Sequence, residues 1–153
     1  APFNDAWWQL PLSVYAHSSM THLAGNATVV AVAGGIVSLS SSWLRFHLFF
    51  LISGMLAGVA HVVATGFLGV PGGVLGASGA AFALVGYLAT SNPITSRVLG
   101  ATSARAAVGV IIAGALVLTL YAAGQNVANV SHFTGAVLGL LAGWFNLLRP
   151  RSA

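Results

Sequence analysis

Charged side chains are nearly absent from this sequence, and their scarcity constrains the fold more than any other feature. Of the 153 residues, 58% are apolar and only 4% are charged. A soluble globular domain is about 25% charged, so this chain cannot cover a surface that faces water. The composition predicts an all-α membrane protein, a polytopic bundle of helical spans.

The few charged residues also exclude several kinds of chemistry. The only acid is Asp5, and there is no cysteine. Paired-carboxylate, HExxH and thiolate sites therefore lack their residues, and we expect no metal site and no cofactor. The five arginines stand singly rather than in a basic run, so nucleic acid is not an expected partner.

Apolar runs divide the chain, read as one membrane domain over 1–153, into five spans. The segment 1–21 is polar and aromatic, which is typical of an external loop at a membrane interface. A turn of three serines and a glycine-rich loop over 66–76 separate some of the spans. The third span is about 13 residues long, too short to cross a hydrocarbon core of about 30 Å, so it should begin inside the membrane. The predicted spans cover 22–39, 43–64, 78–90, 106–123 and 132–148.

Under this five-span reading every arginine lies on one side of the membrane and Asp5 lies on the other. The positive-inside rule then predicts an external N-terminal segment and a cytoplasmic C-terminus. Compact loops favour the plasma membrane of a prokaryote. The arginines are Arg45, Arg97, Arg105, Arg149 and Arg151.

Polar residues inside the predicted spans are candidates for function, because such groups are costly in a bilayer. His22 and Asn26 are four residues apart and share one helical face, with His17 just before them. Interhelical hydrogen bonding is the alternative for this group. His61 has no partner motif, and we interpret it as structural.

Ser78 lies between glycines where a loop meets the short third span. At a helix start, free backbone N–H groups point outward and suit a developing negative charge. Gly76 and Gly79 would let a substrate or another backbone approach closely. The alternative is a serine that only caps the helix.

His132 opens the last predicted span and shares a helical face with glycines at offsets of 3, 7 and 11. Small residues at matching positions of the short span would pack against this face. That packing would bring Ser78 and His132 to the same depth near the outer surface, unless His132 only bonds a loop carbonyl. The two faces comprise Gly135, Gly139 and Gly143, and Gly79, Ala83 and Gly86.

These residues together provide the parts of a serine protease. A serine hydroxyl needs a base to accept its proton, and His132 can be that base for Ser78. The oxyanion then needs donors, which His22, the Asn26 amide and the Ser78 N–H can supply. With no acid suited to orient the histidine, we expect a Ser-His dyad rather than a triad.

The pattern His17-x4-His22-x3-Asn26, then Gly76-Ala77-Ser78-Gly79, then His132-x2-Gly135-x3-Gly139 resembles the rhomboid intramembrane serine proteases. The resemblance covers nearly the whole chain, and the three motifs in this order are highly specific. It implies hydrolysis of peptide bonds in or near transmembrane segments of other membrane proteins.

Carried over residue by residue, the resemblance makes Ser78 the nucleophile and His132 the general base. It assigns the oxyanion site and its support to His22, Asn26, Gly76 and Gly79. His17 becomes a structural motif residue, and Gly135 and Gly139 become the close helix contact.

The sequence departs from the family pattern at three places. The family core has six spans, so the resemblance implies a further helix before residue 1. Gln9 follows Trp8 where the family usually has arginine, and Phe82 stands where a tyrosine commonly stacks on the histidine.

Two other functions stay open. A rhomboid-like protein could bind transmembrane helices without cutting them, although the presence of all four polar site residues argues against this. A small channel could use intramembrane histidines, but it would leave the glycine-flanked serine unexplained. The expected partners are transmembrane substrates and the lipid bilayer, and the sequence makes no prediction of oligomeric state.

Overall fold

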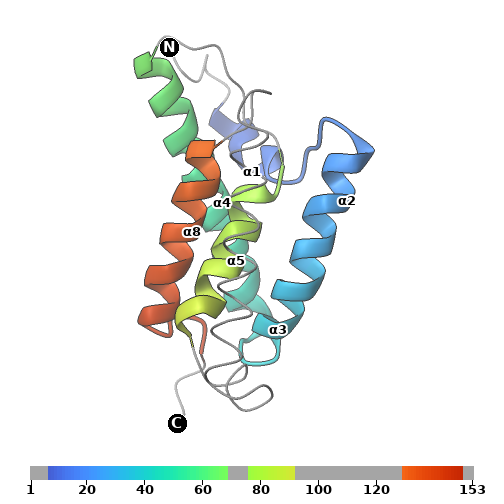
Figure 1. The fold of residues 1–153 in the computed structure, drawn as a ribbon, viewed down its shortest axis with the longest axis vertical. Helices are drawn as coiled ribbons and strands as arrows, with labels where there is room; N and C mark the ends of the chain where they lie inside the picture. Colours follow the sequence, from blue (N-terminus) through green and yellow to red (C-terminus); the bar gives the residue numbers. More distant parts are fainter. Residues whose placement is uncertain (1–6, 69–75, 92–128, 150–153) are drawn as a thin grey trace.

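The computed structural model describes residues 7–68, 76–91 and 129–149, and every secondary-structure element in these ranges is helical (Figure 1). A short helical segment, η1 (Trp7–Gln9) and α1 (Leu10–Ser13), precedes the longer helices. The predicted span 106–123 lies outside the described residues. So do Asp5, Arg97, Arg105 and Arg151.

The first long helix runs from Met20 to Ser38 and contains a π-helical turn. It consists of α2 (Met20–Val29), η2 (Val30–Gly34) and α3 (Gly35–Ser38). None of the α2 residues is buried, and Figure 1 shows α2 standing beside the other helices rather than among them. Its lower part packs more closely, because Ala33, Gly34 and Val37 are buried.

The second long helix, α4, runs from Trp43 to Leu68. Its 26 residues span about 39 Å at 1.5 Å per residue, more than the hydrocarbon thickness of a membrane. The helix continues beyond Ala64, where the predicted span ends. One glycine costs a helix only about 1 kcal/mol, so Gly66 does not end α4.

The short helix α5 (Ser78–Thr90) has the bounds that the sequence predicts and forms the centre of the bundle. Its 13 residues rise only about 20 Å. Leu84 and Tyr87 are almost completely buried, and the core around them includes Val37 and Phe50. A buried central helix needs close neighbours on several sides, which the small residues of α5 allow.

The last helix, α8 (Asn129–Trp144), begins and ends earlier than the predicted range 132–148. It ends because Asn146 adopts a left-handed conformation (φ 51°), which asparagine tolerates better than most residues. The N–H of Leu147 then bonds the Ala142 carbonyl at 3.0 Å, as in a Schellman motif. Its start differs because polar residues are acceptable in the first turn, so His132 lies at the fourth position of α8 rather than the first.

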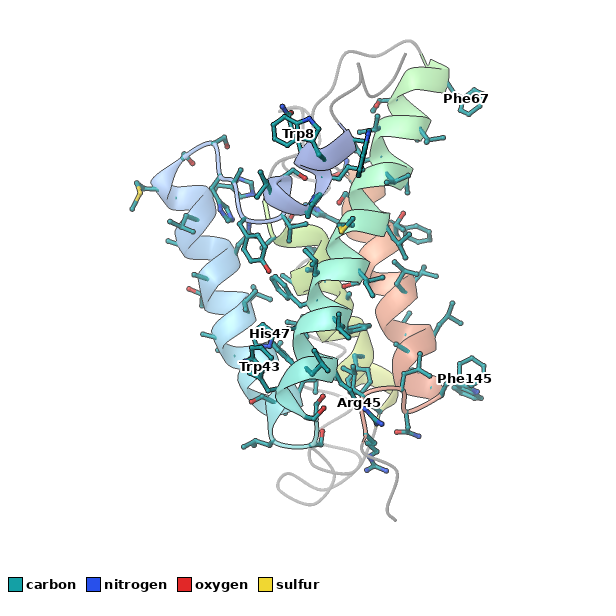
Figure 2. All side chains as sticks on the ribbon, turned by 180° about the vertical axis from the view of Figure 1, so that it is seen from behind. Trp8, Trp43, Arg45, His47, Phe67 and Phe145 are labelled. Carbon is teal, nitrogen blue, oxygen red and sulfur yellow. The ribbon has the colours of Figure 1, made fainter. Side chains whose placement is uncertain are left out.

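Two described helices are long and apolar enough to cross a membrane, Met20–Ser38 and Trp43–Phe67. The ends of the bundle differ in their side chains. Figure 2 shows Trp43, Arg45, His47 and Phe145 at one end, and Trp8 and Phe67 at the other. The Arg45 guanidinium donates a hydrogen bond to the Arg149 carbonyl, so these two arginines share one end, as predicted.

Candidate active site

Ser78 is the first residue of α5, and its side chain is buried. The N-cap of the helix is Ala77, and no side chain caps the first turn. By contrast, α2 has a serine cap, since the His22 N–H bonds the Ser19 hydroxyl at 3.1 Å. Ser78 therefore does not cap α5, which was the alternative interpretation of this serine. The backbone N–H groups in the first turn of α5 donate to no side chain of the described residues and can serve another acceptor.

The helices α5 and α8 pack with their backbones in direct contact. A Cβ added at Gly135 would overlap the carbonyl of Gly79, and one at Gly139 would overlap the carbonyl of Ala83. A Cβ at Gly86 would likewise meet the backbone of α8. This is the packing of the two small-residue faces that their spacing predicts.

His132 lies against the first turn of α5. Its ring is stacked on Phe82, with the ring centroids 4.6 Å apart and the planes within 2° of parallel. Phe82 follows Ser78 by four residues, which is about 6 Å along a helix and close to one full turn. Because Gly135 contacts Gly79, the turn of α8 that carries His132 is next to the turn of α5 that carries Ser78.

The polar residues at the start of α2 form a hydrogen-bonded group. Nδ1 of His17 lies 3.0 Å from the Tyr15 carbonyl, and Nε2 lies 2.9 Å from the Asn26 amide nitrogen. A carbonyl can only accept, so Nδ1 of His17 donates and Nε2 accepts from Asn26. His17 thereby fixes the Asn26 side chain with its amide nitrogen as donor. The His22 ring packs edge-on against His17 at 5.1 Å.

Gly76 brings this group to the start of α5. Its φ of +112° is unfavourable for residues with a side chain. A Cβ there would lie 3.0 Å from Nε2 of His22 and 3.1 Å from the Asn26 amide nitrogen. The Gly76 N–H bonds the Ser13 carbonyl at 2.8 Å. Both donors of α2 therefore face the backbone two residues before Ser78.

Gly79 lies where α5 meets two other helices. A Cβ at Gly79 would lie 2.7 Å from Ala57 and 2.9 Å from the Ser131 hydroxyl. A Cβ at Gly79 would therefore point at α4 and α8, so the missing side chain allows these helices to pack closely, and the backbone N–H of Gly79 stays a predicted oxyanion donor.

His61, which the sequence suggests is structural, is buried on α4. This residue is only 7% exposed, and its Nδ1 has no hydrogen-bond partner among the described residues. Within the described ranges, however, no group of three or more histidines and acids is arranged to hold a metal ion.

A comparison with known families gives a match over most of the chain. The model of the Rhomboid domain matches residues 4–149. No curated protein matches the chain.

Proposed function

Because the chain belongs to the rhomboid family, we propose that it is an intramembrane serine protease with a Ser-His dyad. In this proposal Ser78 attacks peptide bonds in or near transmembrane segments of other membrane proteins, and His132 is the general base. Rhomboid proteins are integral membrane proteins and generally intramembrane serine proteases.

The observation that carries the proposal is the parallel stacking of His132 on Phe82. Stacking on a ring one turn beyond Ser78 holds the imidazole beside the start of α5. The glycine contacts between α5 and α8 support the same arrangement, because interlocked backbones leave little room for one helix to shift along the other.

The chemistry follows from these positions. The Ser78 hydroxyl gives its proton to His132 while its oxygen attacks the peptide carbonyl. The tetrahedral oxyanion accepts hydrogen bonds from the Asn26 amide, from His22 and from the N–H groups at the start of α5. His132 returns the proton to the leaving amine, and a water hydrolyses the acyl-enzyme by the same route.

Charge supports an orientation for the active site. Arg45 and Arg149 lie at the end of the bundle opposite the start of α5 (Figure 2). Under the positive-inside rule the arginine end is cytoplasmic and the Ser78 end faces outward. We infer that cleavage takes place near the outer face, in the plasma membrane of a prokaryote.

A fluorophosphonate probe tests the proposal, because it reacts covalently only with an activated serine. We expect labelling of the wild type and none of Ser78→Ala or His132→Ala. Ser53→Ala is the matched control, since Ser53 is also buried but bonds only the Phe50 carbonyl of its own helix.

Two results would contradict the proposal. A folded wild type that is not labelled would favour the inactive, helix-binding alternative. Labelling of Ser78→Ala at the wild-type rate would show that another serine is the nucleophile.

A further inference from the structure

Two arginines meet at the end of the bundle that lies far from Ser78. The Arg45 guanidinium, at the start of α4, donates to the backbone carbonyl of Arg149, just after α8. Arg45 is exposed and Arg149 is half-buried. The hydrogen bond holds the Arg45 side chain beside the backbone of Arg149, so both basic residues belong to the same end of the bundle.

Within residues 7–68, 76–91 and 129–149 there is no acidic side chain to pair with these arginines. The only acid of the chain is Asp5, and its formal net charge is +4. No fixed counter-ion for Arg45 or Arg149 lies within the described residues, so a bound anion would fit beside them. A guanidinium presents N–H donors in a planar fork that matches a phosphate, and basic sites between transmembrane helices bind lipid headgroups.

The surface around Arg45 is suited to the rest of a lipid molecule. Leu48, Ile52 and Leu56 follow Arg45 on one face of α4 and are 48%, 51% and 48% exposed. Trp43 and Trp144 are both 73% exposed, as expected of aromatic residues at headgroup level. Figure 2 shows Trp43, Arg45 and Phe145 together at this end.

We propose that Arg45 and Arg149 bind the phosphate of an anionic phospholipid, whose acyl chain lies along Leu48, Ile52 and Leu56. The phosphate supplies a counter-charge, and the exposed apolar stripe supplies contact for the chain. None of these residues belongs to the proposed catalytic group, so the lipid site and the protease activity can be tested separately.

Quenching of tryptophan fluorescence by brominated lipids tests this site. The full chain, with Trp7→Phe and Trp8→Phe so that only Trp43 and Trp144 report, is placed in vesicles of phosphatidylcholine and phosphatidylglycerol. Each arginine near the surface should contribute about fivefold, so brominated phosphatidylglycerol should be preferred roughly 30-fold.

Substitutions distinguish a specific lipid site from general attraction of anionic lipid by the net positive charge of the protein. Arg149→Gln should lower the preference about fivefold while leaving the Arg45 hydrogen bond intact, because that bond uses the backbone carbonyl. Adding Arg45→Gln should remove most of the remainder. The matched control is Arg97→Gln with Arg105→Gln, which loses the same charge and should keep the preference.

Several outcomes would overturn the proposal. Equal quenching by the two brominated lipids would show that there is no anionic site. An equal loss in the control pair would show attraction by net charge alone. Reversal by millimolar inorganic phosphate would indicate a free-anion site instead of a lipid site.

Discussion

Replacing Gly139 with alanine should separate the two helices that carry the proposed dyad. A Cβ at this position would overlap the Ala83 carbonyl and the Tyr87 backbone nitrogen. Both obstacles are backbone atoms of α5, which cannot rotate away as the end of a side chain can. The helices must therefore move apart, and the packing of the core around α5 must change with them.

The expected magnitude follows from two opposing effects. Overpacking a tight contact costs about 1–3 kcal/mol, and a backbone obstacle favours the upper end. Alanine also gains about 1 kcal/mol over glycine in a helix. Gly139→Ala should thus lower the free energy of unfolding by about 2 kcal/mol. Gly35→Ala is the matched control, because nothing lies within 4 Å of a Cβ there.

Unfolding by increasing SDS in a mild detergent, followed by circular dichroism, measures both variants. Gly35→Ala should be more stable than the wild type by up to about 1 kcal/mol, and Gly139→Ala less stable. The Gly139→Ala protein should also lose most fluorophosphonate labelling, since His132 moves with α8. If the two alanine variants unfold alike, the close contact of α5 with α8 is not what holds the bundle together.

Four further predictions concern the site. Asn26→Ala should slow fluorophosphonate labelling about 100- to 1,000-fold, because one proposed oxyanion donor is lost, while the unfolding temperature stays unchanged. A labelling rate near that of the wild type would show that Asn26 is not part of the oxyanion site. Gly76→Ala should lower both the labelling rate and the thermal stability, since the φ of Gly76 is positive and a Cβ would press on His22. A labelling rate and an unfolding temperature equal to those of the wild type would contradict the close approach of His22 to Gly76. Phe82→Leu should slow labelling up to about tenfold while Phe82→Tyr does not, because aromatic pairs contribute about 0.5–1.5 kcal/mol; equal rates would mean that the stacked ring has no role. The labelling rate should fall as the pH is lowered, because protonated His132 cannot accept the Ser78 proton, and a rate independent of pH would argue against a histidine base.

The central packing of the fold was predictable from the sequence. Glycines at His132 offsets of 3, 7 and 11 define one helical face, and such a face can only be filled by another backbone. The bounds of α5 were also predictable, because Gly76 precedes Ser78 at a loop-to-helix junction. Small residues carry strong signals in a membrane helix, since they mark where another helix approaches.

The end of α8 and the burial of His61 were harder to predict, because neither depends on hydropathy alone. Apolar composition continues through Leu147 and Leu148, so hydropathy alone could not show that Asn146 ends α8. His61 was interpreted as structural because no motif surrounds it. A signal did exist, since Ser53, Ala57 and His61 are spaced by four and all are buried on α4, which places His61 on the packed face.

The proposed dyad must orient its histidine without the carboxylate of a triad. The stack on Phe82 restricts tilt of the His132 ring, and the glycine contacts restrict movement of α8 along α5. A charged orienting group would need several hydrogen bonds to offset its desolvation inside a membrane. Packing has no such cost, so a rigid helix pair is the better means of positioning a base in this environment. Under the proposed function, the near absence of charge and the tight glycine faces both suit a hydrolytic site in a bilayer.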